Sequence, residues 1–449
     1  MGKIHKFYLN NKYIILDVYS SSIFVVDKMT YDIVDEIDKT NDELYSLFSE
    51  YSKEEIDECL SELRNLKEEG YLFSEEIKSE DIEYNRDNII KAMCLHVSHD
   101  CDLRCRYCFA SQGDFCGERS LMDFETGKRA LDFLIENSGN RKNLEVDFFG
   151  GEPLLNFEVV KKLTLYGDEL NKKTGKNIRF TITTNGVGLD DDKIDFINKH
   201  MYNVVLSLDG RKEINDYMRP TINGKGSYDI IVPKFKKLIE GRGDKDYYIR
   251  GTFTSHNLDF SKDALEFYKE GFDKISLEPV VTDEKEEYAI REEHLEQILE
   301  EYEKFSKIYL DINKDEDKLL FFHFMVDLSN GPCLAKRSIG CGAGCEYISV
   351  TPNGDIYPCH QFASDPSFKL GNIFTGIDKR EITEKFKKAN VFNKEDCKEC
   401  WAKFYCSGGC HANAYFNNHS LNKPYKIGCE MQRKRLECAI SILANKGEI

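Results

Sequence analysis

The sequence predicts an α/β protein whose central domain is a partial (β/α)6 barrel of the TIM type. Between about residue 92 and residue 310, strand-like and helix-like segments alternate, as they do in parallel βα units. Polar or Gly-rich residues follow most of the strand-like segments, which favours functional sites at the C-terminal rim of the barrel. The six strand candidates are AMCLHVS, LEVDFFG, IRFTITTN, NVVLSLDG, YYIRGTFT and KISLEPVV.

Two smaller parts flank this barrel. Residues 1–75 predict a separate domain, because the strand-like runs KIHKFYLNN, YIILDVY and SIFVVD precede the helical patterns TYDIVDEI and EEIDECLSELRNLKEEG. Gly70 is expected to end the second helix, and YLFS to return as a short strand. Residues 76–91 are charged and aperiodic, so we expect a linker there. In residues 311–449 the segments become short and dense in Cys and Gly, and we expect bound metal to order this third domain.

The composition excludes several classes of function. The 449-residue chain carries 80 acidic and 62 basic residues, for a net charge of −18, which argues against nucleic acid as a partner. No stretch approaches the ~18 uninterrupted apolar residues of a membrane span, and the N-terminal residues lack the layout of a signal peptide. The chain is therefore expected to be cytoplasmic with no membrane partner. In that compartment its 16 cysteines indicate metal rather than disulfides.

Three cysteines, Cys101, Cys105 and Cys108, follow the first strand candidate at C-x3-C-x2-C spacing. A cubane [4Fe–4S] cluster has four irons, which Cys thiolates usually hold, so a three-Cys loop leaves one iron open to an outside ligand. The spacing also differs from that of electron-carrying ferredoxins. A partial zinc site or three structural thiols are the alternatives, although zinc sites usually show C-x2-C pairs twice.

The loop resembles the signature of radical S-adenosylmethionine (SAM) enzymes, and Tyr107, just before the third Cys, fits that pattern. The resemblance implies that the open iron binds SAM through its amino and carboxylate groups. One electron from the cluster would then cleave SAM to a 5′-deoxyadenosyl radical, which abstracts a hydrogen from the substrate. A reductant such as flavodoxin or ferredoxin is implied as a partner.

The same resemblance implies which residues contact SAM. The stretch FGGEP contains the family's GGEP motif, in which Glu152 accepts hydrogen bonds from the amino group of SAM. For Leu277 a place in the core is the simpler interpretation, and His96 and His99 are expected to be satisfied or solvated rather than catalytic. The implied cofactor-binding residues are Tyr107, Gly150, Gly151, Glu152, Thr183, Asn185, Ser207, Asp209, Arg219 and Leu277.

A second set of cysteines follows the pattern Cys397-x2-Cys400-x5-Cys406-x3-Cys410-x18-Cys429. Five cysteines exceed what one tetrahedral metal needs, so a zinc-ribbon interpretation leaves one over. The pattern resembles the SPASM domain of radical SAM peptide maturases. That resemblance implies two auxiliary [4Fe–4S] clusters, and therefore three clusters in all.

The resemblance also distributes the cysteines between the two auxiliary clusters. For the fourth ligand of the inner cluster, Cys345, Cys333 and an iron left open to a substrate thiolate all stay as alternatives. Four further cysteines, Cys59, Cys94, Cys116 and Cys438, match no ligand position and are expected to be packing or incidental thiols. The outer cluster would take Cys397, Cys400, Cys406 and Cys429, and the inner one Cys341, Cys359 and Cys410.

Residues 1–75 resemble a RiPP recognition element, a winged-helix-like domain that captures the leader of a ribosomally made precursor peptide as an added strand. A structural cap on the barrel is the alternative. With this domain, the cluster set resembles the maturases of Cys-rich SCIFF peptides, and residues 340–361 are particularly similar to that group. The resemblance implies hydrogen abstraction from a carbon, C–S bond formation with a peptide Cys, and return of one electron to a cluster. No side chain is required as radical initiator.

Two other functions fit parts of the sequence. An anaerobic sulfatase maturase, which oxidises a Cys or Ser to formylglycine, would share the barrel and the clusters but has less need of a leader-binding domain. An iron–sulfur electron-transfer or sensor protein would share the cysteines alone. The GGEP motif and the polar strand ends speak against the second of these.

Overall fold

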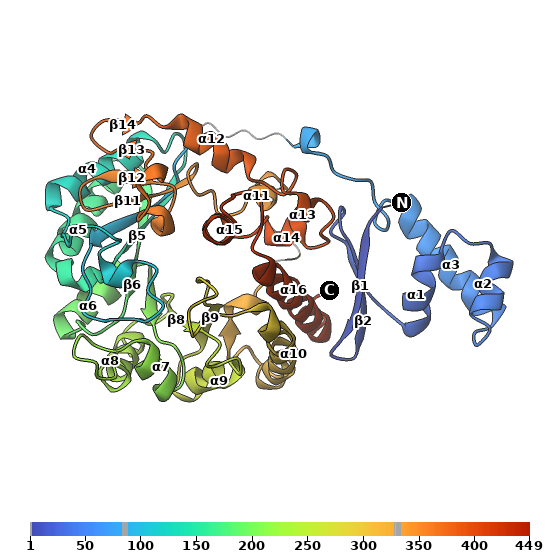
Figure 1. The fold of residues 1–449 in the computed structure, drawn as a ribbon. Helices are drawn as coiled ribbons and strands as arrows, with labels where there is room; N and C mark the ends of the chain where they lie inside the picture. The colour runs from blue at the N-terminus through green and yellow to red at the C-terminus, as the bar shows by residue number, and fades with distance from the viewer. Residues whose placement is uncertain (1, 83–88, 327, 329–333) are drawn as a thin grey trace.

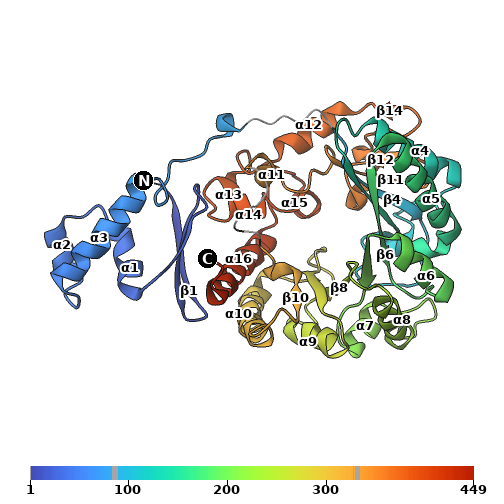
Figure 2. The same cartoon turned by 180° about the vertical axis from the view of Figure 1, so that it is seen from behind.

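The computed structural model describes residues 2–82, 89–326, 328 and 334–449. A sheet with helices on its outer side curves around one half of the molecule (Figure 1), and a small N-terminal domain lies at the opposite end. Between them, short helices of the C-terminal region lie at the open side of the curved sheet, as the view from behind also shows (Figure 2). No helix in the described part of the chain is long and apolar enough to cross a membrane.

The barrel sheet confirms the predicted α/β fold. All six strand candidates form strands, and each pairs in parallel with the next in chain order. A short additional strand, β10 (Leu320–Phe321), pairs in parallel with the sixth. The six are β4 (Ala92–Ser98), β5 (Asn143–Gly150), β6 (Asn177–Thr184), β7 (Asn203–Ser207), β8 (Tyr248–Phe253) and β9 (Lys274–Pro279).

Helices cover the outer face of this sheet. Their amphipathic patterns bury one apolar stripe against the strands; in α4, for example, Ala130, Leu131 and Leu134 are fully buried. The Asp123 carboxylate caps the start of α4 by accepting a hydrogen bond from the amide of Thr126, 2.7 Å away. The helices are α4 (Phe124–Glu136), α5 (Phe157–Thr174), α6 (Asp191–His200), α7 (Lys212–Met218), α8 (Tyr228–Glu240), α9 (Ser261–Lys269) and α10 (Leu295–Ile312).

The C-terminal region extends the same sheet. Strand β11 (Tyr347–Val350) pairs in parallel with β4, and β12 (Asp355–Tyr357), β13 (Gly371–Asn372) and β14 (Gly376–Ile377) continue antiparallel from it. The barrel and the region after residue 311 therefore share one eleven-stranded sheet. Strands of two to four residues carry too little alternation to be recognised in the sequence.

Six α-helices complete the described part of the C-terminal region. The last and longest of them packs along α10 of the barrel. They are α11 (Leu334–Ile339), α12 (Arg380–Lys388), α13 (Glu395–Lys398), α14 (Lys403–Cys406), α15 (His411–Asn418) and α16 (Lys426–Lys446).

The N-terminal domain is a three-stranded antiparallel sheet followed by helices. Its strands β1 (Ile4–Leu9), β2 (Lys12–Asp17) and β3 (Ile23–Val26) lie where the sequence predicts them, and β2 is the central strand. Helices α1 (Lys28–Ile33) and α3 (Lys53–Glu68) match the two helical patterns, whereas α2 (Asn41–Leu47) was not predicted.

The predicted strand at residues 71–74 is wrong. This segment is a bend in which Phe73 has a positive φ of 50°, and the Asp17 carboxylate accepts hydrogen bonds from the amide and the hydroxyl of Ser74. These bonds use backbone that a strand would pair. Gly70 does follow the end of α3, with φ of +77°. The predicted linker is described only at residues 76–82 and 89–91, because residues 83–88 lie outside the described part.

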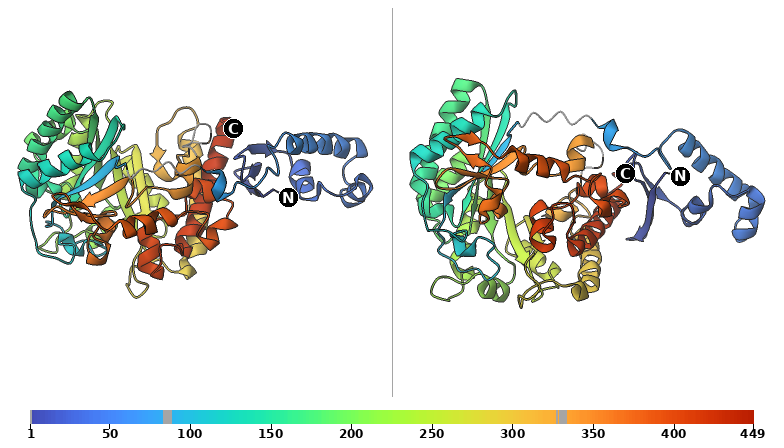
Figure 3. Two further views of the ribbon diagram at one scale, coloured as in Figure 1. Left: turned by 90° about the horizontal axis from the view of Figure 1, so that it is seen from above. Right: turned by 45° about the horizontal axis from the view of Figure 1, so that its top comes forward.

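One face of the N-terminal sheet attaches this domain to the rest of the molecule. Ile15 faces the domain's own helices, whereas Leu16 and Val18 pack against Trp401 and against Leu436 of α16. The His5 ring also stacks on Trp401, with ring centroids 3.8 Å apart. Figure 3 shows the N-terminal sheet beside α16, with α1–α3 on its far side. The contact is apolar and buried, so it fixes where the domain sits.

Replacing the fully buried Leu16 by Ala should therefore destabilise the protein by about 2–5 kcal/mol, because it leaves a cavity between β2 and α16. Urea unfolding monitored by the fluorescence of Trp401, the one tryptophan, measures the change at this contact. Leu47→Ala is the matched control, since Leu47 is 51% exposed in the same domain. Equal effects of the two substitutions would contradict the described packing.

Candidate functional site

The three-Cys loop lies between β4 and α4 at the C-terminal rim of the barrel. Backbone bonds hold it against the segment after α7: the amide of Arg104 donates to the Pro220 carbonyl at 2.8 Å, and that of Arg106 to the Met218 carbonyl at 2.9 Å. The thiols of Cys101, Cys105 and Cys108 are all partly exposed. The loop is thus fixed by its backbone, which leaves the thiols available.

Burial makes two of these thiols weak acids. It raises the pKa of Cys101 well above its usual range, where the Glu152 carboxylate adds to the effect. Burial also raises the pKa of Cys105 to about 11, although the Arg219 guanidinium opposes this shift. Such thiols are neutral at pH 7 unless a positive charge is supplied. A bound metal cluster would supply that charge and deprotonate them.

Gly150 and Gly151 allow the end of β5 to press against the start of the Cys loop. A Cβ at Gly150, whose φ is +127°, would lie 2.1 Å from the Ser98 carbonyl oxygen, and one at Gly151 would lie 2.3 Å from that of Asp100. The Gly151 amide donates to the Ser98 carbonyl at 2.8 Å. The two glycines therefore serve a backbone-to-backbone contact that no larger residue permits.

The next residue, Glu152, is a buried carboxylate in a dense set of donors. It accepts hydrogen bonds from the Asn185 amide at 2.8 Å, the Thr184 hydroxyl at 2.7 Å and the Leu154 amide at 3.0 Å. Burial and repulsion from Asp102 raise the pKa of Glu152 to about 7. The Asn185 side chain donates to Asp102 at 2.7 Å. A cation placed beside this pair of carboxylates would be strongly favoured.

Tyr107, Asp209 and Arg219 form one connected group. The Tyr107 hydroxyl lies 2.5 Å from the Asp209 carboxylate and accepts a hydrogen bond from Arg219 at 2.9 Å. The Thr252 amide donates to the other oxygen of Asp209 at 3.0 Å. Arg219 is buried, and its Nε has no hydrogen-bond partner among the described residues. The group joins the Cys loop to the ends of β7 and β8.

The remaining predicted SAM contacts lie in two different environments, the strand ends and the hydrophobic core. Thr183 and Ser207 are half-buried at the ends of β6 and β7, and the Thr183 hydroxyl lies 3.2 Å from the Asp147 carboxylate. Burial raises the pKa of Asp147 to about 7, a perturbed group that the sequence did not indicate. Leu277 is fully buried in the hydrophobic core.

His96 and His99 are buried at the rear of the Cys loop. Their ring nitrogens lie 3.1 Å apart, and both rings contact that of Phe115. Burial lowers the pKa of His99 to about 4 and that of His96 well below its usual range. Two neutral, mutually bonded histidines agree with the expectation of a packed pair rather than a proton-transfer site.

Four of the C-terminal cysteines gather into one group, which we call the outer group: Cys397 on α13, Cys400 after it, Cys406 on α14 and Cys429 on α16. Burial raises the pKa of Cys397 to about 12, and the charges of Cys406, Cys429 and Cys400 add to that shift. The Cys429 thiol likewise interacts with Cys406 and Cys400. The four thiols are therefore close enough to interact electrostatically.

A second group, the inner group, contains Cys341, Cys359 and Cys410. Burial raises the pKa of Cys359 to about 12, with contributions from Cys410 and Cys341, and Cys410 interacts with Cys341 in turn. The buried thiol of Cys345 lies 3.7 Å from the Thr383 carbonyl. Cys333, the other alternative for a fourth inner ligand, lies outside the described residues.

The remaining cysteines belong to neither group, although the thiol of Cys94 interacts with that of Cys359 in the inner group. Cys59, Cys94 and Cys438 are buried in three different elements, α3, β4 and α16, and Cys116 is exposed. Across the described ranges, no three Cys, His, Asp or Glu side chains converge closely enough to hold a single metal ion.

The surroundings of Lys394 indicate whether the two cysteine groups fit a metal cluster. The sequence did not mark this lysine as a site residue. Its side chain is fully buried, and its ammonium donates to the Gly408 carbonyl at 2.7 Å. No carboxylate of the described residues forms an ion pair with it; the ionisable groups that interact with it are the thiols of Cys397, Cys406, Cys410 and Cys429, which are neutral without a bound metal. A buried cation without a counter-charge is costly. Thiolates bound to a cluster would neutralise it, so the residues present fit such a group.

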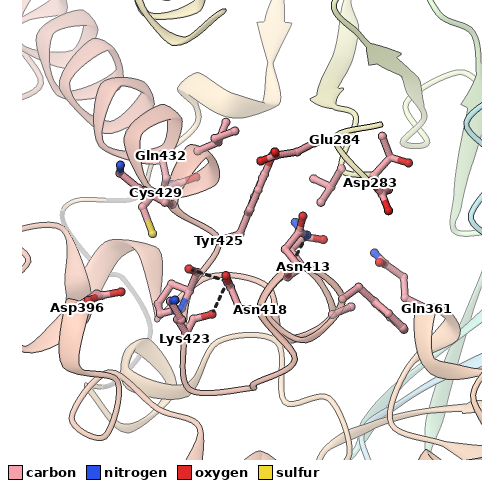
Figure 4. Close-up of a pocket in the computed structure, with 18 of the residues that line it drawn as sticks. Asp283, Glu284, Gln361, Asp396, Asn413, Asn418, Lys423, Tyr425, Cys429 and Gln432 are labelled. Carbon is pink, nitrogen blue, oxygen red and sulfur yellow. Dashed lines mark hydrogen bonds between the residues drawn. The ribbon is translucent and has the colours of Figure 1, made fainter. Parts of the chain in front are cut away.

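A cavity of about 1260 Å³ connects the parts of the site (Figure 4). Tyr107 and Cys108 line it from the Cys loop, and the outer group lines it from the C-terminal region. Residues 281–286, which follow β9, and Tyr425 enclose the remainder; in Figure 4, Asp283 and Glu284 lie across the cavity from Asn413 and Gln361. The loop after β9 has no periodicity or motif that would have marked it as part of a site.

Comparisons with known proteins agree with this arrangement. The profile of the radical SAM superfamily matches residues 95–249, and that of the SPASM iron–sulfur cluster-binding domain matches residues 341–401. The first match contains the Cys loop and the GGEP motif, and the second contains part of both C-terminal cysteine groups. SAM and iron–sulfur clusters are therefore the cofactors that these domains bind.

Three similar proteins span most of the chain. A cysteine-type anaerobic sulfatase-maturating enzyme of Clostridium novyi (strain NT) is 27% identical over 334 residues, which cover 71% of this chain and 86% of that enzyme. The structure of anSMEcpe with bound AdoMet and Cp18Cys peptide has a TM-score of 0.65 at 21% identity and covers 80% of this chain and 98% of that one. Streptococcus suis SuiB bound to the precursor peptide SuiA has a TM-score of 0.55 at 17% identity, with coverages of 95% and 99%.

Replacing Lys394 by Met should raise the midpoint of thermal unfolding of the metal-free protein by about 2–4 °C, because it removes an uncompensated buried charge. After anaerobic reconstitution with iron and sulfide the gain should disappear, since the cluster thiolates then neutralise the wild-type ammonium. Differential scanning calorimetry of both forms measures the effect.

Lys388→Met, at an exposed position on α12, is the control for loss of a lysine and should leave both midpoints unchanged. A Lys394→Met protein that is equally destabilised with and without iron would contradict the electrostatic role.

Proposed function

The chain is a radical SAM protein with a SPASM domain, and we propose that it installs thioether crosslinks, from Cys sulfur to carbon, in a ribosomally made Cys-rich precursor peptide. The observation that carries this proposal is the cavity of about 1260 Å³, because Cys108 of the radical SAM loop and the outer Cys group line the same space. A peptide in that space would lie between a source of radicals and a set of metal-bound thiolates.

The residues that would hold the cofactors follow from the site. Cys101, Cys105 and Cys108 would hold the radical SAM cluster, the outer group one auxiliary cluster, and the inner group the other, for three [4Fe–4S] clusters in all. When bound, SAM and its cluster supply a radical that removes one hydrogen atom from a substrate carbon. The chain's own side chains then have to bind, orient and shield the reactants.

Glu152 is suited to the amino group of SAM. Its carboxylate is buried, and repulsion from Asp102 makes its ionised form costly without a cation. An ammonium group would relieve that cost. It would meet a carboxylate whose orientation three hydrogen bonds already fix. Tyr107, Asp209 and Arg219 would hold the loop so that the cluster and Glu152 keep a constant separation.

The peptide assignment draws on the similar proteins. The anSMEcpe structure contains a peptide, and the SuiB structure contains a precursor peptide. The SuiB match covers 95% of this chain, which leaves too few residues uncovered to omit residues 1–75. We assign that domain to leader binding. Strands β1 and β3 are both edges of its sheet among the described strands, and we assign β3 as the docking edge because β1 packs beside α16.

Formylglycine formation is the second candidate, and the similarity to the Clostridium novyi sulfatase-maturating enzyme favours it. The two functions differ in product rather than in cofactors. A thioether removes two hydrogens and one free thiol per bond, whereas formylglycine is an aldehyde on a former Cys or Ser.

The product distinguishes them. Incubated anaerobically with SAM, dithionite and a short Cys-rich peptide found encoded beside its gene by sequencing the neighbouring genes, the enzyme should yield a peptide two hydrogens lighter per crosslink. Tandem mass spectrometry should show suppressed fragmentation between the joined residues, and one thiol per bond should resist iodoacetamide. A product trapped by a hydrazine would establish the formylglycine candidate instead.

Replacing Cys101, Cys105 and Cys108 together by Ala should abolish SAM cleavage while the auxiliary clusters remain. Iron content after reconstitution should fall from about twelve to about eight atoms per chain, and 5′-deoxyadenosine should no longer form. Cys116→Ala, in the same segment but exposed and outside the group, is the control. Persistent 5′-deoxyadenosine in the triple variant would refute the radical SAM site at these three cysteines. It would also show that the protein is not merely an electron carrier, because an electron carrier does not cleave SAM.

The register of β2 and β3 gives a sharp test of leader docking. The Asp17 amide donates to the Ser22 carbonyl at 2.9 Å, and bonded pairs alternate along an antiparallel ladder. Phe24 and Val26 therefore exchange bonds with β2, whereas the amide of Val25 points to the open edge. Val25→Pro removes that outward donor and leaves the ladder with β2 in place.

In Val25→Pro, modification of the full-length peptide should fall at least about tenfold, through loss of strand pairing. Val25→Ala, which keeps the amide, should retain it. SAM cleavage without peptide should be the same in both variants. Unimpaired modification by Val25→Pro would show that the leader does not pair with β3.

A further inference from the structure

A second, smaller cavity lies beside the main one. Its volume is about 380 Å³, and Gln432 of α16 lines both cavities. We call it the side pocket and define it by Glu278, Phe322, His323, Arg337, Gln432 and Arg435. The pocket lies where the end of β9, helix α11 and helix α16 meet. The two cavities are therefore neighbours that share the Gln432 side chain as a wall.

Arg435 lines this pocket, and one of its guanidinium nitrogens has no hydrogen-bond partner among the described residues. The residue is 9% exposed, and its Nε donates to the Tyr302 hydroxyl at 2.8 Å. Its Nη1 lies 3.9 Å from the Glu278 carboxylate, which is too far for a good hydrogen bond. Its Nη2 is buried and has no partner among the described residues. Leaving such a charged donor unpaired is costly, so the pocket favours an acceptor.

Among the described residues that line the pocket, Glu278 is the one carboxylate, and it is already engaged. It accepts hydrogen bonds from His323 at 3.0 Å and from Ser276 at 3.1 Å. Although burial opposes ionisation, His323, Arg435 and Arg250 hold the pKa of Glu278 well below its usual range. Arg337 adds a further guanidinium whose Nε is also buried without a partner. Arg435 and Arg250 thus act on Glu278, and Arg337 lines the same pocket, so that among the described lining residues the guanidinium groups outnumber the one carboxylate.

The pocket lies on a path between the N-terminal sheet and the main cavity. At one end, Arg337 donates to the Ser21 hydroxyl at 3.2 Å, and Ser21 is two residues before β3. At the other end, Gln432 opens to the main cavity. Phe322 and Met325, which are 52% and 47% exposed, line the pocket as an apolar rim. A peptide that runs from β3 to the cysteine groups would pass this rim.

We propose that the side pocket binds a carboxylate side chain of the substrate peptide, located between the leader on β3 and the segment that is modified. The guanidinium of Arg435 would receive the carboxylate through Nη2, and Arg337 would contribute from the β3 side. This inference rests on the proposed peptide-modifying function. It adds a requirement on the substrate: an Asp or Glu downstream of the leader.

The experiment measures binding to the reconstituted enzyme without any turnover. The probes are the tripeptides acetyl-Gly-Glu-Gly-amide and acetyl-Gly-Gln-Gly-amide, titrated in a ligand-observed NMR assay, with inorganic phosphate as a third arm. The Glu peptide should bind roughly tenfold more tightly than the Gln peptide, since it adds a charge-assisted hydrogen bond. Arg435→Gln should remove that preference.

Two further variants keep the test independent of folding. Arg337→Gln lies at the half-buried end of the pocket and should weaken binding of the Glu peptide several-fold. Lys434→Gln is the matched control on the same helix, because Lys434 pairs with Glu303 and Glu437 and does not line the pocket. It should leave the preference intact.

Equal binding of the two peptides, or an unchanged preference in both arginine variants, would overturn the inference. Phosphate that binds more tightly than the Glu peptide, with the same sensitivity to the arginine variants, would assign the pocket to a free anion and would overturn it as well. Failure of peptide modification, with the Glu preference intact, would count against the proposed function alone.

Discussion

The close contact between the ends of β4 and β5 is the constraint on which the site depends. At Gly150 and Gly151 two backbones approach so closely that any side chain would overlap the carbonyls of Ser98 and Asp100. The Glu152 amide then donates to the Asp100 carbonyl at 2.8 Å. The first cysteine of the loop and the buried carboxylate are therefore parts of one rigid turn. A substitution that separates the two strands would therefore displace the first cysteine and the Glu152 carboxylate together.

Helix α16 connects three parts of the molecule and so constrains their relative positions. It packs on α10 of the barrel, buries Leu436 against the N-terminal sheet, and carries Cys429 of the outer group. Arg433 on the same helix lies with Nη1 3.9 Å from the Cys400 sulfur. One element thus sets the distance between the barrel, the N-terminal domain and the outer cysteines. If a peptide docks on the N-terminal sheet as we propose, the same helix connects that docking to the geometry of the outer group.

The sequence predicts the parts of this protein whose signal is local. The six barrel strands are recognisable because each is a short apolar-rich run, whose buried positions alternate in β5 to β8 and are nearly continuous in β4 and in the middle of β9. The cysteines are recognisable because metal ligands keep fixed spacings. Helix α2 had a local signal too, the Thr40–Glu43 capping box. The strand expected at residues 71–74 is absent because a distant carboxylate, Asp17, binds its backbone instead. Lys394 and Arg435 read as ordinary charges in the sequence, since their burial arises only when remote elements pack around them.

The distribution of charge explains how a strongly acidic chain can favour anionic ligands. The net charge is −18, and most of the acidic side chains are solvated at the surface, where they cost little. Lys394, in contrast, is buried without an ion pair to any described carboxylate, and Arg435 is buried with a donor that Glu278, 3.9 Å from its Nη1, does not satisfy. Cluster thiolates would neutralise the first, and a substrate carboxylate would bind the second. Each proposed ligand would therefore stabilise the folded state that binds it, and both would act on the C-terminal region.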